Sequence, residues 1–294
     1  MDTTTYRFKL GDFQCIVVSD GTHTYAPPTF PPPAMFLFAN APREYLEQTL
    51  REHNLILDKW SEWTSPYICL MVNTGEHLVL VDTGAGGLGP NTGRLVQNLK
   101  ASGITAEDID TVIITHAHPD HIGGITDSEG RLTFPNAHYV MSRDEWDFWT
   151  TDRAETKLDE HVRDILVSYA RNNLTAIQSR LNPIESETEI LPGIQAIFAP
   201  GHTPGQIALT VTSKVEQLLC ISDVVLHPIH LEHPEWHAAV DLDPEQVETT
   251  RRRILEKAVA ENALVLGFHF PFPGLGHVSQ KADTWQWQPI STSG

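Results

Sequence analysis

The sequence Thr111-Val112-Ile113-Ile114-Thr115, followed at once by His116-Ala117-His118-Pro119-Asp120-His121, decides how the rest of the chain is interpreted. Its first part is apolar and β-branched, which is typical of a short buried strand. Its second part begins where that strand ends, and residues two apart in an extended backbone project to the same side. The first two histidines of the run can therefore approach one ion together.

Pro119 turns the chain behind those two histidines, so that Asp120 and His121 can aim at a neighbouring point. Gly123 and Gly124 then give the backbone room to enter a helix. Imidazole nitrogen and carboxylate oxygen are ligands that Zn²⁺ and similar cations take. The alternative, a histidine-rich solvated loop, accounts poorly for this spacing directly behind a strand. The run therefore predicts a metal site.

Three more polar residues follow strands later in the chain. Taken singly, a histidine after a strand is usually a loop residue and an aspartate usually a cap, but catalytic groups gather on loops that a rigid sheet holds. We therefore expect these residues to join the first group: His202, in Gly201-His202-Thr203-Pro204-Gly205 after the strand 194–199; Asp223, after the strand 218–221; and His269, after the strand 264–268.

The composition fits a folded chain and excludes several partners. The chain has 294 residues, 38 of them acidic and 20 basic, for a net charge of −18, and 40% are apolar. This apolar content is ample for a core, and the acidic excess repels phosphate backbones and anionic lipid. We therefore expect neither nucleic acid nor a membrane as a partner. No apolar run approaches the ~20 residues that a bilayer requires.

Cysteine usage and the start of the chain indicate a cytoplasmic protein. Cys15, Cys69 and Cys220 each lie in an apolar run that is typical of a strand. An odd count without C-x-x-C spacing predicts reduced, buried thiols, with a mispaired disulfide or a reactive thiol as alternatives. Residues 1–5 show no signal-peptide features.

Strands and helices alternate along the chain in two broad halves, which fits β-sheets packed inside helical layers. No repeat or linker divides the chain, so we expect one domain over 1–294, with residues 1–60 as an N-terminal extension. Helices are expected at 41–54, 91–102, 158–181 and 243–262, and a further one capped by Ser142. Strands are expected at 6–20, as a hairpin, and at 66–74, 77–81, 111–115, 136–141, 194–199, 206–212, 217–222, 263–267 and 284–290.

Two segments keep alternative interpretations. Residues 25–38 hold five prolines among aromatic residues and are expected to form neither a helix nor a central strand. This segment is either a stiff surface linker or an apolar lid or dimer contact. The loop after Asp223 holds four histidines: His227, His230, His233 and His237. We expect them to be polar loop residues; the alternatives are a substrate contact and, after it, a third metal site.

With these motifs in this order, the sequence resembles the metallo-β-lactamase superfamily from about Pro66 to near the C-terminus. The resemblance implies an α/β fold, the four-layer αβ/βα sandwich, with a dinuclear metal site between the inner strand ends. It rests on Val81-Asp82-Thr83-Gly84, the HxHxDH run at 116–121, Gly201-His202-Thr203-Pro204-Gly205, Asp223 and His269.

The resemblance also implies a role for each residue of the site. Asp82 would support the first metal loop without binding a metal. The implied cofactors are two divalent ions, zinc first, with manganese, iron or cobalt as alternatives. His116, His118 and His202 would bind one ion, Asp120, His121 and His269 would bind the other, and Asp223 would bridge them.

This ligand set predicts metal-assisted hydrolysis. Two ions about 3.5–4 Å apart can hold a bridging hydroxide, because metal binding lowers the pKa of water to roughly 7. One ion polarises a carbonyl or phosphoryl oxygen while the hydroxide attacks, and Asp120 is the catalytic residue expected to handle the proton. The expected substrate is a lactone or neutral ester. The alternatives are a phosphotriesterase and, below it, a β-lactamase, a glyoxalase II-type thioesterase, a diiron redox protein and a metal-binding structural protein.

Two branches of the superfamily remain after the motifs are compared: acyl-homoserine lactonases and enzymes similar to methyl parathion hydrolase. Residues 81–90 and 269–277 resemble the second branch, as does Leu226, where the lactonases typically place a tyrosine. Asp223 counts against the β-lactamases, which lack it. Ser222 departs from the family's usual glycine and is expected to stiffen its loop slightly.

An apolar wall is expected around the site, which favours a small, neutral, apolar substrate. A homodimer is expected from segment 25–38 and from the resemblance. The expected wall consists of Leu226, Ile229, Trp236, Phe268, Phe270 and Phe272.

Overall fold

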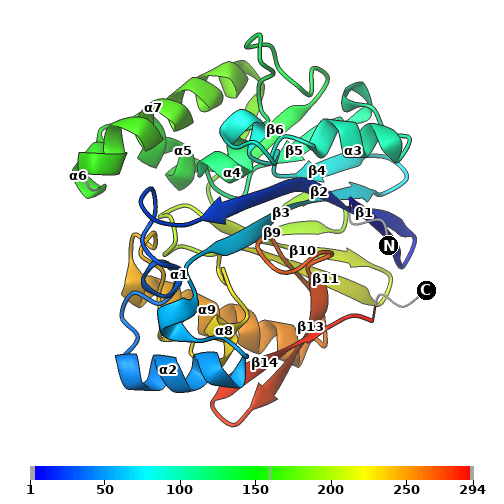
Figure 1. The fold of residues 1–294 in the computed structure, drawn as a ribbon. Coiled ribbons are helices and arrows are strands. Elements are labelled where there is room, and N and C mark those ends of the chain that lie inside the picture. The colour runs from blue at the N-terminus through cyan, green and yellow to red at the C-terminus, as the bar shows by residue number, and fades with distance from the viewer. Residues whose placement is uncertain (1–3, 159, 292–294) are drawn as a thin grey trace.

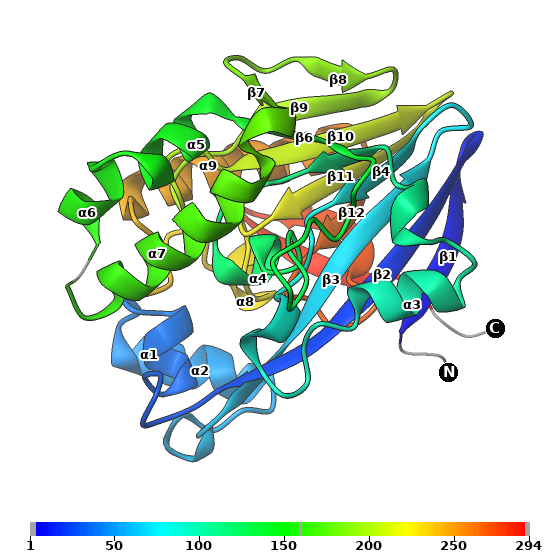
Figure 2. The same cartoon turned by 90° about the horizontal axis from the view of Figure 1, so that it is seen from above.

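The computed structural model describes residues 4–158 and 160–291, which form two β-sheets that face each other. Helices α3 (Leu95–Ala101), α5 (Arg143–Thr150) and α7 (Glu160–Ile177) cover the outer side of the first sheet (Figures 1 and 2). Helix α9 (Pro244–Ala260) covers the outer side of the second sheet. The layers run helix, sheet, sheet, helix, which confirms the predicted four-layer α/β sandwich.

In the first sheet the spatial order of the strands is their order in the chain. The strands up to β4 pair antiparallel, and β4 to β7 pair in parallel. Parallel strands end at the same edge of a sheet, so the loops after β4 and β5 lie side by side. The strands are β1 (Thr5–Leu10), β2 (Phe13–Tyr25), β3 (Trp63–Asn73), β4 (Leu78–Val81), β5 (Thr111–Ile113), β6 (His138–Ser142) and β7 (Leu181–Ile184).

The second sheet runs in the order β14-β13-β12-β11-β10-β9-β8. Within the described residues only β11 and β12 pair in parallel here, so the loops that follow these two strands leave the sheet at one edge. The strands are β8 (Glu189–Leu191), β9 (Ile194–Phe198), β10 (Ile207–Ser213), β11 (Glu216–Ser222), β12 (Leu264–Gly267), β13 (Leu275–Lys281) and β14 (Thr284–Pro289).

Apolar side chains of both sheets fill the space between them. Val17, Leu70 and Val81 of the first sheet share one buried cluster with Leu209 and Leu218 of the second. Burial of each such side chain stabilises the fold by about 1.5–3 kcal/mol. The three cysteines are free and buried within the strands, as predicted.

Most predicted elements are present, and the exceptions have local causes. Residues 33–37 form helix α1 (Pro33–Leu37), so the prediction that this segment forms no helix is wrong: proline is tolerated in the first helical turn. The helix predicted to reach residue 181 ends at Ile177, and β7 follows it with Pro183 on an edge strand, where a missing N–H does no harm. The short strand β8 and the polar, glycine-containing β13 carried no clear alternation and were not predicted.

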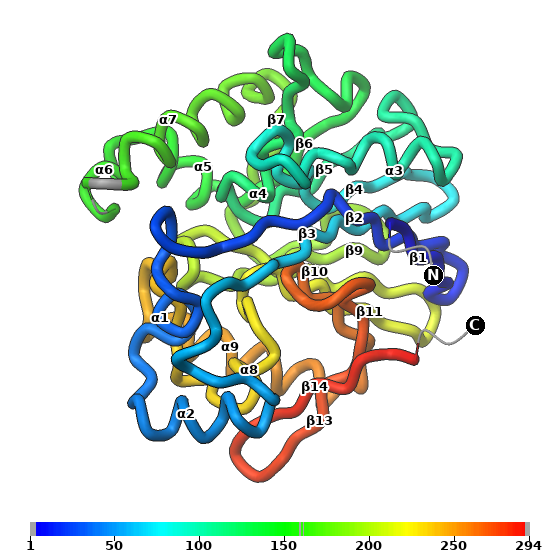
Figure 3. Tube along the Cα trace, viewed as in Figure 1, coloured from blue at the N-terminus to red at the C-terminus, as the bar shows by residue number. Residues whose placement is uncertain are grey.

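The segment after β2 leaves the first sheet and packs beside the second one (Figure 3). Helices α1 and α2 (Arg43–Glu52) lie next to α8 (Ile229–Glu232), and the backbone N–H groups of Ala39 and Ala239 donate to His237 and Phe36. Segment 25–38 is therefore not a surface linker, because much of it is buried against the loop that follows Asp223. A dimer contact through this segment stays a prediction.

None of the helices in residues 4–158 and 160–291 is long and apolar enough to cross a membrane. The expectation about a signal peptide concerns residues 1–5, of which residues 1–3 lie outside the described part of the chain.

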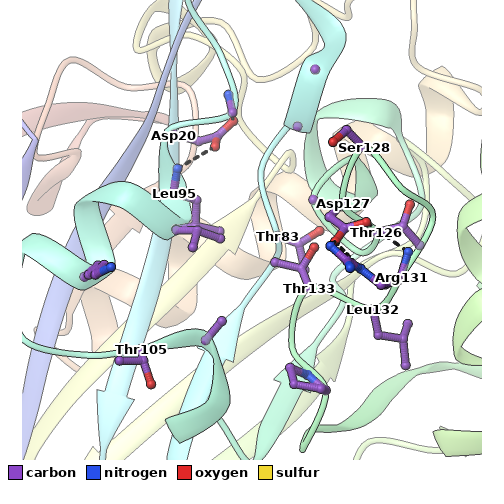
Figure 4. A pocket seen from close by; sticks show the side chains of 18 of the residues that line it. Asp20, Thr83, Leu95, Thr105, Thr126, Asp127, Ser128, Arg131, Leu132 and Thr133 are labelled. Atoms are coloured by element: carbon purple, nitrogen blue, oxygen red, sulfur yellow. Dashed lines mark hydrogen bonds and ion pairs between the residues drawn. The ribbon is translucent and has the colours of Figure 1, made fainter.

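Asp20 of β2 fixes the loop that follows Asp82, and its removal should destabilise the fold. Its buried carboxylate accepts the backbone N–H groups of Ala85 (2.8 Å), Gly93 (3.1 Å) and Leu95 (2.9 Å; Figure 4). Asp20→Ala leaves the buried N–H groups of Ala85 and Leu95 and the more exposed one of Gly93 without their acceptor, so we expect the free energy of unfolding in urea to fall by about 2–4 kcal/mol. Asp12→Ala, at an exposed site, is the control and should change it by less than about 0.5 kcal/mol. An equal loss of stability in Asp20→Ala and Asp12→Ala would contradict the role of Asp20 in fixing the loop.

Candidate metal centre

The seven predicted ligand residues lie on four loops at one edge shared by the two sheets. The first loop continues into the short helix α4 (Pro119–Ile122), whose first turn redirects the chain. His116, His118, Asp120 and His121 follow β5, His202 follows β9, Asp223 follows β11 and His269 follows β12.

One group of donor atoms comes from His116, His118 and His202. His118 Nδ1 lies 3.2 Å from His116 Nε2 and 2.8 Å from His202 Nε2. The rings of His116 and His202 are buried, and their centroids are 5.0 Å apart. The three nitrogens therefore converge on one point, and these residues could hold one metal ion.

A second group comes from Asp120, His121 and His269. Asp120 Oδ2 lies 3.9 Å from His121 Nε2 and 3.5 Å from His269 Nε2. These three residues form a second cluster that could hold a metal ion. Its atoms lie beside those of the first group, and both groups meet at a single aspartate.

Asp223 joins the two groups. Its Oδ2 lies 3.4 Å from His202 Nε2 in the first group and 3.1 Å from His269 Nε2 in the second. Its Oδ1 lies 3.2 Å from His121 Nε2. The carboxylate is in the position expected of a bridge between two ions.

The donor atoms fit two divalent metal ions. Two ligand atoms on one tetrahedral zinc ion lie about 3.3 Å apart, since the bonds are about 2.0–2.2 Å long. The donor atoms within each group lie 2.8–3.9 Å apart, on both sides of this value. His121 Nε2 and Asp223 Oδ1 are also buried without a hydrogen-bond partner among the described residues, although such atoms are normally paired. A cation beside them would satisfy both atoms.

The charges in the site complement each other. Burial, aided by neighbouring imidazoles, holds the pKa of His116 and of His118 well below its ordinary value, so both rings are neutral and able to bind a cation. Burial opposes ionisation of His121 as well, but the carboxylates of Asp223 and Asp82 outweigh it and raise the pKa of His121. Burial likewise works against the charge of Asp223, yet His269 and His121 hold its pKa well below the usual range.

Four of the five histidines are held through their second ring nitrogen, which fixes the tautomer and the ring orientation. Asp82 contacts His121 Nδ1 at 2.8 Å and also accepts from the backbone N–H and the hydroxyl of Thr115. Thr115 itself contacts His116 Nδ1 at 3.2 Å. The remaining two contacts join His202 to Asp241 (2.7 Å) and His269 to Ser65 (2.8 Å).

Sequence reasoning missed Asp241 and Ser65. Asp241 lies in a loop before α9, and Ser65 lies inside β3, next to a proline. Neither carries a local motif, because each acts on a histidine from a distant part of the chain. Only the three-dimensional arrangement identifies them.

Ser222, which stands where the family usually has glycine, adopts a left-handed backbone with φ +47°. This conformation favours glycine and strains a serine. Its hydroxyl donates to Thr115 Oγ1 at 2.8 Å. The serine therefore adds a contact to the support of the first loop while it leaves Asp223 in place.

The residues of the predicted pocket wall lie in different parts of the structure. Leu226, Ile229 and Trp236 share one buried cluster next to segment 25–38. Phe268 stacks on the His121 ring, 3.9 Å between centroids. Phe270 packs against Trp287 instead, and Phe272 packs into the core between the sheets, so neither lines the site. The chain turns away from the metal centre directly after His269.

An aromatic wall that the sequence did not reveal borders the second group. The rings of Trp63 and Tyr67 lie 6.0 and 5.6 Å from the ring of His269. Tyr25 stacks on Trp63, and its hydroxyl lies 2.7 Å from that of Tyr67. Tyr25 ends β2, Trp63 begins β3 and Tyr67 lies inside β3. Tyr25 belongs to segment 25–38 and Trp63 precedes the strand expected at 66–74, so only Tyr67 was expected in a strand.

The histidines of the loop after Asp223 have packing roles. His230 is buried and contacts the carbonyl of Leu37 at 2.8 Å. His233 stacks on Trp236, and His227 and His237 make backbone contacts. No cluster of ligand type within the described residues includes any of them.

A large cavity elsewhere is separate from the metal centre. It has a volume of about 1060 Å³ and lies between α3 and the loops around Thr83 and Arg131 (Figure 4). None of the seven ligand residues lines it. Its size therefore does not identify it as the active site.

His269→Ala should remove one of two bound ions, because it takes a donor atom from the second group and leaves the first group complete. We expect zinc per chain, measured by elemental analysis after dialysis, to fall from two ions to one. His277→Ala, which changes a histidine outside the site, should keep both ions. Two ions in His269→Ala would show that the second group is misassigned.

Burial of His230 as a neutral ring should make stability depend on pH. Burial and the nearby Arg251 hold the pKa of His230 well below its ordinary value, so the unfolded chain binds a proton that the folded chain excludes. Stability is therefore lost as pH falls below about 6.5, by up to about 1.4 kcal/mol per pH unit from this group. His230→Leu should show a shallower decline in urea unfolding between pH 6.5 and 5, and an unchanged slope would contradict this assignment.

Two of the solved structures that match nearly the whole chain are 28% and 29% identical to it. The dizinc quorum-quenching lactonase AidC, in complex with a product N-hexanoyl-L-homoserine, has a TM-score of 0.89 and 28% identity over 99% of both chains. AbOPH, a hydrolase of the beta-lactamase superfamily, has a TM-score of 0.87 and 29% identity, again over 99% of both chains.

The sequence relatives and the family model agree with these structures. The N-acyl homoserine lactonase AiiA of Bacillus thuringiensis subsp. kurstaki is 24% identical over 225 residues, which cover 69% of this chain and 81% of AiiA. The lactonase AiiB of Agrobacterium fabrum is 24% identical over 62% of this chain and 64% of AiiB. The model of the metallo-beta-lactamase superfamily matches residues 66–269, well over half of the chain, and the chain therefore belongs to that superfamily.

Proposed function

We propose that the chain is a metal-dependent hydrolase that opens lactones or cleaves neutral esters. The observation that carries this proposal is the position of Asp223 between two complete ligand groups, with Oδ2 3.4 Å from His202 Nε2 and 3.1 Å from His269 Nε2. The similarity to a dizinc lactonase over nearly all of both chains supports it. The lactonase relatives of AiiA type support it as well.

When bound, two divalent ions supply a nucleophile at neutral pH and polarise the oxygen of the scissile carbonyl group. The chain's own residues hold the geometry and move the proton. Asp120 is the catalytic residue in this proposal, because its carboxylate belongs to the second group and its side chain keeps some exposure to solvent, 12%. A carboxylate in this place can take a proton and return it to the leaving oxygen.

The surroundings of the site favour a neutral and apolar substrate. Trp63 and Tyr67 lie against His269, and Leu226, Ile229 and Trp236 pack behind them. Such a wall excludes water and offers no cation to a charged substrate. Acyl-homoserine lactones and simple aryl esters meet this requirement. A phosphotriester is also neutral and is the second candidate, because Leu226 stands where the lactonases place a tyrosine.

We propose zinc as the metal, with manganese, iron and cobalt as alternatives. The site offers five imidazole rings and two carboxylates, and zinc binds both kinds of ligand. The dizinc composition of AidC supports this choice.

We also propose that the chain is one domain, that it forms a homodimer and that it is cytoplasmic. Both sheets contribute ligands to one site, so neither half could carry the site alone. Met35 of segment 25–38 is 63% exposed and could contact a second copy. Three free thiols fit a reducing compartment. The net charge of −18 argues against nucleic acid as a partner.

A substrate panel tests the proposal. Zinc-loaded protein is offered acyl-homoserine lactones, aryl esters, a phosphotriester, a β-lactam and a glutathione thioester. We expect the highest kcat/KM for the lactones or aryl esters and values lower by roughly 10-fold or more for the rest, because an apolar wall discriminates by about 1–3 kcal/mol per misfitted group.

The same panel is repeated after metal removal by a chelator and after zinc is restored. Activity should disappear and return. Preference for the β-lactam or the thioester, full activity without metal, or redox-active iron in the active protein would overturn the proposal.

A further inference from the structure

Glu145 is a buried carboxylate that has no role in the proposed hydrolysis. It lies in the first turn of α5, is fully buried, and accepts four hydrogen bonds. Oε1 accepts from the backbone N–H of Ala117 (2.9 Å) and from Trp149 Nε1 (2.7 Å). Oε2 accepts from the hydroxyl of Thr203 (2.6 Å) and from the backbone N–H of Gly205 (3.0 Å). The four donors fill the lone-pair positions of the carboxylate.

A buried carboxylate is costly unless it is paired or fully hydrogen-bonded. No lysine, arginine or histidine side chain in the described part of the chain forms an ion pair with Glu145, so hydrogen bonds alone compensate its charge. An apolar residue in the same space would leave four donors from several segments without an acceptor, at a cost of about 1–3 kcal/mol for each buried one. The arrangement therefore has a role beyond filling the core.

All the donors belong to segments that position one ligand group. Ala117 lies between the ligands His116 and His118, and Thr203 and Gly205 directly follow His202. Trp149, the fourth donor, places its ring 5.8 Å from the ring of His118, edge to face. Glu145 thus ties the first loop to the loop after β9, which comes from the other sheet.

The second ligand group has separate supports. Ser65 contacts His269 and Asp82 contacts His121, and neither touches Glu145. Asp82 also reaches the first group, since Thr115, which it holds, contacts His116. Ser65, by contrast, contacts a ligand of the second group, and the four hydrogen bonds of Glu145 come from segments beside the ligands of the first group.

The backbone at Gly205 is adapted to this contact. A Cβ atom at position 205 would lie 2.0 Å from the backbone nitrogen of Glu145 and 2.5 Å from its Cα atom. Real side chains do not tolerate such distances, so glycine is required for the loop to approach the start of α5. The backbone N–H of Glu145 is itself capped by the hydroxyl of Ser142 at 3.1 Å.

We propose that Glu145 is a positioning residue that holds His116, His118 and His202 in place for the first metal ion and has no direct part in holding the second. This inference rests on the proposed dinuclear function. Glu145→Gln keeps the shape of the side chain but replaces one acceptor oxygen by an NH₂ group that faces two donors. The backbone N–H of either Ala117 or Gly205 then loses its acceptor, because a backbone N–H can only donate, whereas the Thr203 hydroxyl can rotate and accept.

Metal affinity in two single-site backgrounds tests the inference without any substrate. In His269→Ala the first group is complete, and in His202→Ala the second group is complete. We expect Glu145→Gln to weaken zinc binding about 10- to 100-fold in the His269→Ala background, measured by competition with a chromophoric chelator. In the His202→Ala background it should change zinc affinity by less than about 3-fold.

The matched control is Ser65→Ala, which should show the reverse pattern because the Ser65 hydroxyl contacts His269 of the second group. Absorption spectra of bound cobalt add a spectroscopic signature. Glu145→Gln should change the cobalt spectrum in the His269→Ala background and leave it unchanged in the His202→Ala background. Amide hydrogen exchange at Ala117 and Gly205 in the metal-free protein should become faster in Glu145→Gln.

Equal losses in both backgrounds, or none in the first, would overturn the inference. If Glu145→Gln does not fold, Thr203→Val tests the inference instead, since it removes one donor and keeps the carboxylate. It should weaken zinc binding only in the His269→Ala background, and by a smaller factor than Glu145→Gln. A chain without lactone or ester turnover that still shows the selective loss would refute the proposed function and leave the role of Glu145 standing.

Discussion

The contact between the Asp223 carboxylate and the imidazoles around it is the interaction on which the rest of the structure depends. Asp223 is buried, and nitrogens of His116, His121, His202 and His269 lie 3.1–3.7 Å from its oxygens. One carboxylate can join two cations only if both ligand groups reach it at once. The fold meets this requirement because β5 and β11 end at the same edge of two sheets that face each other, with an apolar core fixing their separation.

Rigidity around this carboxylate comes from side chains that hold the second ring nitrogen of the ligand histidines. Asp241 holds His202, Ser65 holds His269 and Asp82 holds His121, each through a contact of 2.7–2.8 Å. The aromatic wall at Trp63 and Tyr67 keeps water away from one side. Electrostatic interactions are stronger in such an environment, which suits a site that must stabilise developing charge on an oxygen.

Much of the fold and the set of candidate ligands could be predicted from sequence, for identifiable reasons. The run 116–121 follows a β-branched strand, so both its spacing and its place in the fold are local properties. The same holds for His202, Asp223 and His269, which directly follow apolar strands. By contrast, Ser65, Asp241 and Glu145 act on residues far away in the chain, and Glu145 follows Ser142 at the spacing of an ordinary helix cap. Phe270 and Phe272 were misplaced because a turn after His269, invisible to periodicity, sends them into the core.

Zinc titration of the metal-free chain tests the central claim, a dinuclear site joined by Asp223, most directly. With a competing chelator and elemental analysis as the readout, the account predicts two zinc ions per chain, and hydrolytic activity that reaches its maximum only when the second ion is bound. A chain that binds one ion and is fully active, or that shows no change in activity on binding the second, would contradict it.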